Sequence, residues 1–448
     1  MLCSFTVSNY KSFNTKQTLS MEAGKIRNYS NRVLAEDNFK LLKFLAIYGA
    51  NASGKSSLVN AMDLCHEIIT SKIPSDCNND YCRNIEDNKN KPSAFVFVIK
   101  INNKKYEYGF EILLAEREVV SEYLFEITKT GIKRTIFLRD VKNGSYNVGS
   151  YFKNIEINSR LNIYAEDLKN DGSTLFLTQM NQNKGDLYTK FPDLVTYKMV
   201  FDWFKIQLSV NHPDRPVTGY SYITDKENIE KISKLLESFD TGITNFTIVE
   251  IPIEKVTSEI PKSLFDHITE MLIEQKKQAE KTNSDDTPSI MLRANDNTMF
   301  IIQYCEENIV CKTMEFTHRN VKSHFSLEDE SDGTVRLLDL IEILLCDDND
   351  RVYVIDEINR RFHPLLTRKF VEKYLELAEK RNIQLIVTTH ESELMSFDLL
   401  RKDEIAFVSK DKNGMSEFFS MEKFDARFDK KVRNAYLHGD YGAIPSFE

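Results

Sequence analysis

Residues Gly49–Ser57 have the sequence GANASGKSS, and this stretch decides the fold. It matches the pattern G-x-x-x-x-G-K-[ST], in which a glycine-rich loop wraps around phosphate groups. The apolar run Leu41–Ala50 leads into it and predicts a strand. Residues Ser56–Ile69 follow it and predict a helix. A strand, a phosphate loop and a helix in this order predict an α/β fold.

Each part of the loop has a physical task. A glycine at position 54 lets the backbone come close to phosphates, and the N–H groups and the positive end of the following helix then attract the anion. Lys55 would neutralise the β- and γ-phosphates, and the Ser56 hydroxyl would be a ligand of Mg²⁺. The candidate nucleotide-binding residues are Gly49, Asn51, Ser53, Gly54, Lys55, Ser56 and Ser57.

The bulk composition excludes several classes of protein. The chain has 448 residues, enough for two or three domains, and 41% hydrophobic with 28% charged residues is typical of a soluble globular protein. A net charge of -9 argues against a protein whose main task is to coat nucleic acid. Seven cysteines, an odd number without paired metal-ligand spacing, indicate reduced thiols and no zinc site. No secretion signal or membrane-spanning run is apparent, so we expect a cytoplasmic protein.

Two further stretches end in residues suited to phosphate chemistry. VYVIDE, Val352–Glu357, is an apolar strand followed by two acids: Asp356 would bind Mg²⁺ and Glu357 would accept a proton from the attacking water. IQLIVTTH is a second such strand, and it ends at His390. Because parallel strands end at one edge of a sheet, His390 is expected beside the acids, where it could hydrogen-bond the γ-phosphate or the water.

The rest of the chain divides by its pattern. Short alternating strands and polar turns over residues 94–140 predict an antiparallel meander. Helical spacing predicts helices over Asp225–Ser238 and Ser258–Lys281. From Val352 to Ser409 strands alternate with helices, including a helix expected over Glu391–Leu399.

This set of motifs resembles the ABC-type ATPase heads of the SMC and double-strand-break-repair proteins. It resembles more closely the compact bacterial AAA-type ATP-binding proteins related to the overcoming-lysogenization-defect (OLD) ATPases, several of which serve in phage-defence and abortive-infection modules. Four stretches carry the resemblance, namely SFTVSNYKSF, GANASGKSS, IDEINRRFHP and AYLHGDYGAIPSFE. It covers the first 70 residues and roughly residues 315–448.

The resemblance implies an ABC-type P-loop NTPase head, a mixed sheet with a β-lobe and helices, with an inserted helical and α+β domain. Residues 1–150 would hold the phosphate loop and an antiparallel β-lobe. Residues 151–315 would be a mainly helical insertion with short strands that senses or holds a partner. Residues 316–448 would complete the head.

The stretch DESDGTVRLLDL, Asp329–Leu340, receives a role from the same resemblance. In the family, such a turn before a helix touches the γ-phosphate held by the partner subunit, which implies this role for Ser331 and Gly333. The alternative is that Ser331 or Asp332 only caps the helix.

Two further family positions are less defined in this sequence. Lys11 lies in the opening turn, whose basic residues reach the nucleotide α-phosphate or base in relatives, or it is simply an exposed lysine. The glutamine that links the metal to the β-lobe would be Gln179 or Gln182.

The predicted function is that of an ATPase that uses ATP and Mg²⁺, dimerises its heads around the nucleotide and acts as a switch or sensor. By resemblance, its setting is bacterial antiviral defence, with a separately encoded effector and a nucleic-acid or phage-derived trigger, and with no membrane partner. Two alternatives stay open. The chain could be an ATP-stabilised scaffold or inhibitor of a toxic effector with little turnover, or it could be a DNA-repair-type ATPase.

Overall fold

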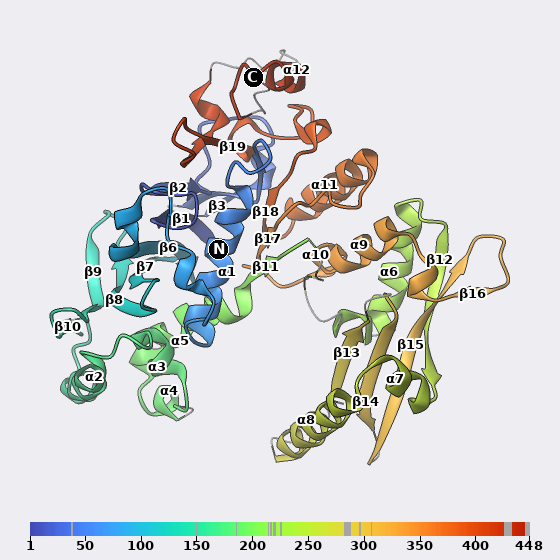
Figure 1. The fold of residues 1–448 in the computed structure, drawn as a ribbon, viewed down its shortest axis with the longest axis horizontal. Helices are drawn as coiled ribbons and strands as arrows, with labels where there is room; N and C mark the ends of the chain where they lie inside the picture. Colours follow the sequence, from blue (N-terminus) through green and yellow to red (C-terminus); the bar gives the residue numbers. More distant parts are fainter. Residues whose placement is uncertain are drawn as a thin grey trace. The chain divides into compact units, whose positions relative to one another are not determined.

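A mostly parallel sheet of six strands carries the phosphate loop in the computed structural model (Figure 1). Its strand order is β11 (Leu208–Asn211), β17 (Val352–Ile355), β18 (Gln384–Thr388), β5 (Phe44–Tyr48), β19 (Ile405–Lys410) and β20 (Ser416–Ser420). The first five strands are parallel, and β20 runs antiparallel to β19. The side chains of β5, β17 and β18 are all buried, as expected of a parallel sheet covered on both faces.

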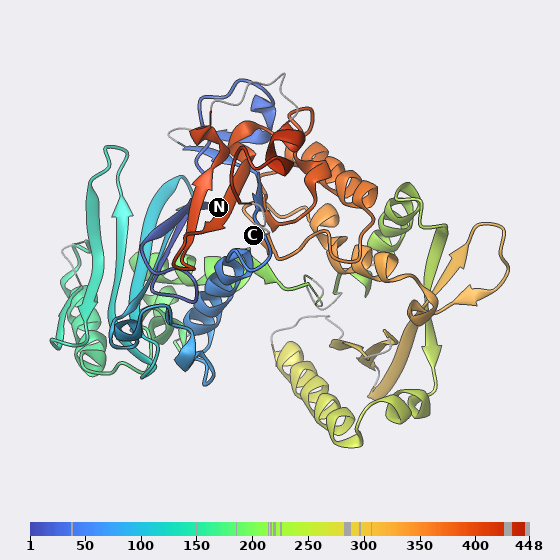
Figure 2. The ribbon, with the colours of Figure 1, turned by 45° about the horizontal axis from the view of Figure 1, so that its top comes forward.

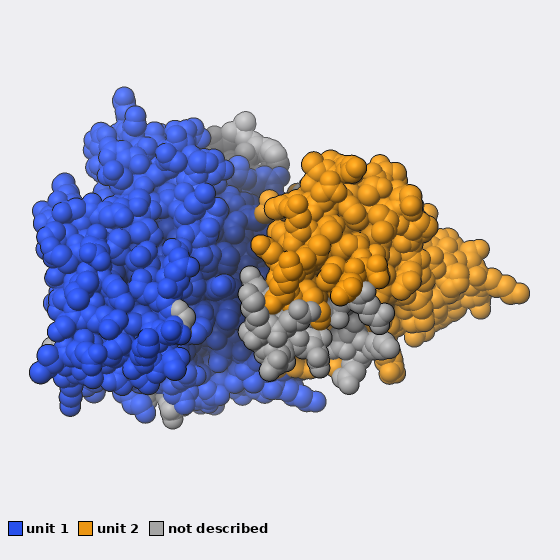
Figure 3. Space-filling model, turned by 90° about the horizontal axis from the view of Figure 1, so that it is seen from below, with its two compact units in different colours: residues 1–213, 348–359, 371–448 blue, residues 214–347, 360–370 orange. Residues whose placement is uncertain are grey.

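The structure describes residues 1–36, 39–148, 151–184, 186–213, 215, 217, 221–224, 226–281, 288–294, 297–305, 307–424 and 432–443. The chain forms two units, which Figure 3 colours separately. The first unit contains residues 1–213, 348–359 and 371–448, and the second contains residues 214–347 and 360–370. Among the described residues, every helix is too short or too polar to span a membrane.

A seven-stranded antiparallel sheet stands beside the six-stranded one in the first unit (Figure 1). Its order is β10 (Ser145–Asn147), β9 (Lys133–Asp140), β8 (Glu118–Ile127), β7 (Lys104–Leu113), β6 (Ser93–Ile101), β1 (Leu2–Ser8) and β2 (Gln17–Ser20). The meander predicted over residues 94–140 is therefore confirmed. A separate ribbon pairs β3 (Val33–Glu36) with β4 (Phe39–Leu42).

One apolar core joins these two sheets and five helices of the first unit. The helices are α1 (Lys55–Thr70), α2 (Ile155–Leu168), α3 (Phe176–Asn181), α4 (Leu187–Lys190) and α5 (Val195–Asp202). Helix α12 (Val432–Leu437) belongs to the same unit and packs the Tyr436 ring 5.9 Å from the ring of Tyr48 in β5, centroid to centroid. Trp203, in a π-helical turn after α5, is fully buried with its ring centroid 6.1 Å from that of Phe97 in β6. The same core contains Ile47 of β5 and Val354 of β17, so the antiparallel lobe is packed onto the parallel sheet.

The second unit is built on a separate antiparallel sheet. Its strands are β12 (Ile243–Ile251), β15 (Asn308–His318), β14 (Met299–Cys305) and β13 (Ser289–Arg293) in this order, with β16 (His324–Phe325) on β15. Its helices are α6 (Lys226–Ser238), α7 (Ile253–Glu259), α8 (Lys262–Lys281), α9 (Asp332–Leu340) and α10 (Glu342–Leu345). Helix α8 lies against the strands of this sheet (Figure 2), and its Ile268 and Leu272 belong to one cluster with Phe300 and Ile302 of β14. Helix α11 (Pro364–Ala378) begins in this unit and ends in the first.

The helix expected over Ser258–Lys281 is confirmed over Lys262–Lys281 as α8, whereas Ser258 and Glu259 form the end of α7. The two helices are separate because Pro261 disfavours helical backbone at the residue before it. Another helix prediction was wrong. The helix expected over Glu391–Leu399 is a single 3-10 turn, Ser392–Leu394. There the Glu391 side chain accepts the Glu393 N–H, a local bond that competes with a continuing helix.

The boundaries of the two units differ from the domain ranges expected from the sequence. Residues 151–213, expected in the insertion, belong to the first unit with the phosphate loop. The expected insertion and the second unit overlap over residues 214–315 only.

Candidate nucleotide site

The glycines of the phosphate loop are required by close packing. Gly54 has φ +114°, and a Cβ there would lie 2.3 Å from Ser416 Oγ and 2.7 Å from Ser12 Oγ. A Cβ on Gly49 would lie 2.4 Å from the Val408 carbonyl oxygen. Residues from both ends of the chain therefore hold the loop in its shape, and no larger side chain fits at either position.

Lys55, the first residue of α1, is buried under the loop. Its Nζ donates to the carbonyl oxygens of Gly49 at 2.8 Å and Ala50 at 2.9 Å. Burial lowers the pKa of Lys55 to about 8, while Asp356 and Glu357 oppose the shift. The Ser53 hydroxyl is also buried and has no hydrogen-bond partner among the described residues. A cation and an unsatisfied hydroxyl beside free N–H groups suit a phosphate ligand.

The two acids after β17 are held by one threonine of the neighbouring strand. The Thr388 hydroxyl donates to Asp356 Oδ1 at 2.5 Å and accepts the Glu357 N–H at 2.8 Å. Asp356 is buried, whereas the Glu357 side chain is about one-third exposed and its backbone has φ +47°. The first acid is thus fixed in place, and the second remains accessible to solvent.

His390 lies beside Glu357, as the strand order predicts. Its Nε2 is 3.9 Å from Glu357 Oε1. Burial, followed by the charge of Lys55, lowers the pKa of His390, so the neutral imidazole predominates at neutral pH. Because it is neutral, His390 can accept or donate a hydrogen bond at the edge of the sheet where the acids lie. The preceding residue, Thr389, also bonds the loop after β17, since its Oγ1 donates to Asn359 Oδ1 at 3.0 Å.

A pocket of about 510 Å³ collects most of the predicted residues. It is lined by Ser12, Asn51, Ala52, Ser53, Gly54, Lys55, Ser56, Ser57, Glu357, His390 and Lys410. Ser12 and Lys410 in this wall, and Thr388 beside the acids, belong to no motif and were not predicted from the sequence.

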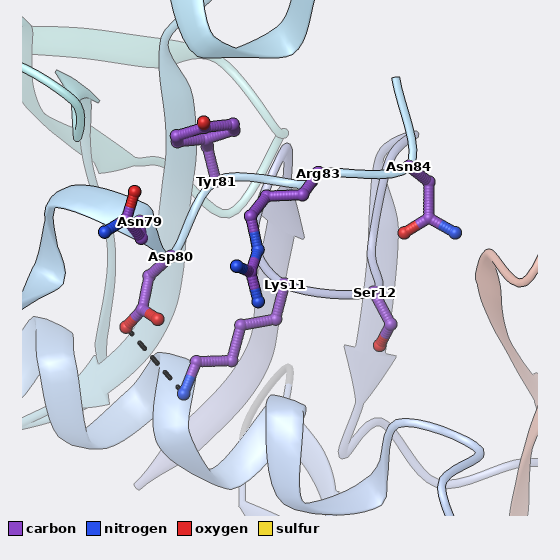
Figure 4. Close-up of a pocket in the computed structure, with 7 residues that line it drawn as sticks. All are labelled: Lys11, Ser12, Asn79, Asp80, Tyr81, Arg83 and Asn84. Carbon is purple, nitrogen blue, oxygen red and sulfur yellow. Dashed lines mark ion pairs between the residues drawn. The ribbon is translucent and has the colours of Figure 1, made fainter. Parts of the chain in front are cut away.

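Lys11 lines a neighbouring pocket of about 700 Å³ (Figure 4). Lys11 and Ser12 form one side and residues 79–84 the other, and Lys11 Nζ lies 3.7 Å from Asp80 Oδ2. Ser12 belongs to both pockets, so the two cavities are adjacent.

Ser331 caps α9 in the second unit, whereas the phosphate loop belongs to the first. Its hydroxyl accepts the Thr334 N–H at 3.1 Å, so Ser331 is the N-cap of this helix. Two contacts link this turn to Arg361 of the same unit. Arg361 NH1 lies 3.6 Å from Asp332 Oδ1, and a Cβ on Gly333 would lie 3.2 Å from the Arg361 carbonyl oxygen.

Neither candidate glutamine lines the phosphate pocket. Gln182 instead donates to the Ser71 carbonyl oxygen at 3.4 Å, at the far end of α1 from the loop. The polar residue beside the acids is Asn211, at the end of β11, whose carbonyl oxygen accepts the Asp356 N–H at 2.9 Å. The alternation of apolar and polar residues ahead of Asn211, IQLSV, was the available signal.

The donor set fits Mg²⁺. Mg²⁺ prefers oxygen ligands and usually takes one or two from the protein, with waters and substrate phosphates completing the shell. The Ser56 hydroxyl and the Asp356 carboxylate are two such oxygens, each following a strand of the parallel sheet. The described residues contain no group of three or more His, Cys, Asp or Glu that could hold a metal without such a substrate.

The sequence matches a family model over residues 44–176 and 214–396, and the family is described as an AAA domain, putative AbiEii toxin, type IV TA system. No curated protein matches significantly. Among solved structures, an SmcHead bound to the C-winged helix domain of ScpA matches with 15% identity and a TM-score of 0.41, covering 94% of this chain and 98% of that one.

Two other SMC heads match over similar lengths. The SMC head domain from Thermotoga maritima has 13% identity and a TM-score of 0.35, covering 94% of this chain and 98% of its own. The Smc head domain with an extended coiled coil bound to the C-terminal domain of ScpA, derived from Pyrococcus furiosus, has 15% identity and a TM-score of 0.36, covering 94% and 97%. Because the family model matches well over half of its residues, the chain belongs to the AAA domain family described as putative AbiEii toxin, type IV TA system.

Proposed function

We propose that the protein binds ATP with Mg²⁺ and hydrolyses it, and that two copies pair around the nucleotide to form a switch. The observation that carries the proposal is that one pocket holds both the phosphate loop and the pair Glu357 and His390. A phosphate-binding wall thus faces a base that could activate water.

The chain's own residues divide the work. The loop N–H groups, the Ser53 hydroxyl and Lys55 bind the phosphates, and Lys55 exchanges its contacts with Gly49 and Ala50 for phosphate oxygens. Glu357 accepts a proton from the attacking water, and the neutral His390 orients the water or the γ-phosphate. Ser56 and Asp356 would hold Mg²⁺, which when bound neutralises charge on the phosphates.

We place the nucleoside in the neighbouring pocket. The two cavities share Ser12, so a nucleotide with its phosphates at the loop would extend its sugar and base toward Lys11. Lys11, Arg83, Asn79 and Asn84 offer donors there, and Asp80 holds Lys11 in position. This arrangement supports the role of Lys11 near the α-phosphate or base.

The turn Ser331–Gly333 would complete the site from a second copy. Its hydroxyl and the first N–H groups of the nine-residue helix α9 form a donor group that suits an anion. Two copies exchanging this turn would each contribute to the other's γ-phosphate, and hydrolysis would release the pair. The description of the family as toxin–antitoxin related supports a setting with a separately encoded effector, for which the second unit offers a docking region.

The test is the mass in solution of Glu357→Gln with and without ATP and Mg²⁺. This variant should bind ATP without hydrolysing it, and a larger species should appear only with nucleotide. Adding Ser331→Arg should abolish the larger species. The matched control is Ser326→Arg, which alters another serine cap in the same unit.

Three results would count against parts of the proposal. If Glu357→Gln binds no ATP, the nucleotide site is wrong. If it binds but never pairs, the switch is wrong. Binding and pairing in a wild-type protein that shows no turnover would favour the ATP-stabilised scaffold.

A further inference from the structure

Lys410, the last residue of β19, lines the phosphate pocket from outside all the recognised motifs. Strand β19 lies next to β5 in parallel, with Phe407 opposite Tyr48, so Lys410 extends past the point where the phosphate loop begins. Among the described residues, its ammonium group has no ion-pair or hydrogen-bond partner. Lys410 is thus a second lysine that lines the pocket, besides Lys55.

The direction of the Lys410 side chain follows from its partner across the hairpin. Lys410 is paired with Ser416 of β20, and residues directly opposite in an antiparallel pair project to the same face of the sheet. The Ser416 hydroxyl donates to the Ser53 carbonyl oxygen of the phosphate loop at 2.5 Å. Lys410 is thus directed to the face on which the loop lies.

The turn between the two strands is held by specific bonds. Asp411 Oδ1 accepts the N–H groups of Asn413 at 2.9 Å and Met415 at 2.8 Å. Asn84, from the wall of the neighbouring pocket, donates to the Asn413 carbonyl oxygen at 2.9 Å. A backbone fixed at both ends lowers the conformational cost of placing the Lys410 amine on a ligand.

The strand order tells which phosphates Lys410 would meet. Glu357 and His390 follow β17 and β18 on one side of β5, whereas Lys410 ends β19 on the other side. Water attack takes place on the side of Glu357. Lys410 lies instead on the opposite side of β5, where we place the α- and β-phosphates that remain with the nucleoside.

Resting on the nucleotide site proposed above, we infer that Lys410 binds the α- or β-phosphate and holds ATP and ADP alike. Such a contact stabilises bound substrate and bound product by the same free energy. Its loss should raise the KM for ATP and leave kcat nearly unchanged, unlike the loss of Glu357.

The experiment compares Lys410→Ala with Lys412→Ala, which removes the same charge from an exposed position of the same hairpin that does not line the pocket. Affinity for ADP·Mg is measured on the otherwise wild-type protein by titration calorimetry, and affinity for ATP·Mg is measured in a Glu357→Gln background. We expect Lys410→Ala to weaken both by about tenfold, the usual loss for one charge-assisted bond. Lys412→Ala should stay within about twofold, and Lys410→Arg should restore most of the affinity.

Two outcomes would overturn the inference while leaving the proposed site intact. One is that Lys410→Ala binds nucleotide with the same affinity as its parent protein. The other is a loss for ATP without a loss for ADP, which would put Lys410 at the γ-phosphate. Absence of binding in the parent itself would instead overturn the nucleotide site on which the inference rests.

Discussion

The hydroxyl of Thr388 bridges the two acids of the site, donating to Asp356 Oδ1 at 2.5 Å and receiving the Glu357 N–H at 2.8 Å. A strand that contributes no acid thus sets the positions of both. Because Asp356 is buried, this bond also compensates the desolvation of its carboxylate.

Thr388→Val keeps the shape of the side chain and removes its hydroxyl. We expect turnover to fall by about tenfold or more while ATP still binds, because both acids lose their support. The free energy of unfolding should fall by roughly 1–3 kcal/mol, as for other buried polar groups left unpaired. Steady-state kinetics and urea unfolding measure the two effects.

The control for that variant is Thr178→Val. Thr178 is fully buried and donates to the Ile69 carbonyl oxygen at 2.7 Å, but it does not line the phosphate pocket. It should cost similar stability and leave turnover unchanged. Equal turnover in Thr388→Val and wild type would show that the bridge has no catalytic role.

Gly54→Ala tests the packing of the phosphate loop. The new methyl group would meet Ser416 and Ser12 at distances that no Cβ tolerates, so the loop must shift. We expect nucleotide affinity to fall by roughly 100-fold, the effect of a displacement of about 1 Å in a binding site.

Gly131→Ala separates this clash from backbone strain. Gly131 also has positive φ, +82°, but a Cβ there meets nothing within 4 Å. It should lower the free energy of unfolding by about 1 kcal/mol and leave nucleotide affinity unchanged. Nucleotide affinity retained by Gly54→Ala would mean that the loop does not bind phosphate in this conformation.

Nucleotide affinity should depend on pH through Lys55. Burial lowers its pKa to about 8 in the free protein, and bound phosphates would raise it, so binding takes up a proton at higher pH. Affinity for ADP should be constant near pH 7. Well above pH 8 it should decrease with a slope that approaches about tenfold per pH unit. Titrations from pH 7 to pH 9.5 measure this, and Lys55→Arg, whose guanidinium stays charged, should remove the slope if it binds. A flat wild-type profile to pH 9.5 would contradict the assignment.

Glu122→Ala should lower the free energy of unfolding without altering any residue of the candidate nucleotide site. Glu122 is fully buried, accepts the N–H groups of Phe176 and Leu177 at 2.6 and 3.0 Å, and lies 3.6 Å from Arg139. Its removal leaves a buried guanidinium without this partner, which typically costs about 3–5 kcal/mol. Glu118→Ala, an exposed position on the same strand, is the control for unfolding measurements. A loss below about 1 kcal/mol would show that water or another group replaces the carboxylate.

The sequence predicted the strands β5, β17 and β18 because each is a mainly apolar run that is followed by residues suited to phosphate chemistry. It did not predict Thr388, Ser416 or Lys410. Serine, threonine and lysine are common at strand ends. The pairing of β18 with β17 brings Thr388 to the acids, and the pairing of β19 with β5 and β20 brings Lys410 and Ser416 to the loop. The break at Pro261 was available from local chemistry alone, and helical periodicity obscured it.

Strand β5 has a consequence for how the protein is made. It spans Phe44–Tyr48 and is synthesised early, yet both of its neighbours, β18 and β19, lie after residue 383. The serine that supports the phosphate loop, Ser416, comes later still. A nascent chain therefore cannot assemble this candidate site until residue 416 has been synthesised. Such long-range pairing is slow to form, so a chain that is still being synthesised would not bind ATP.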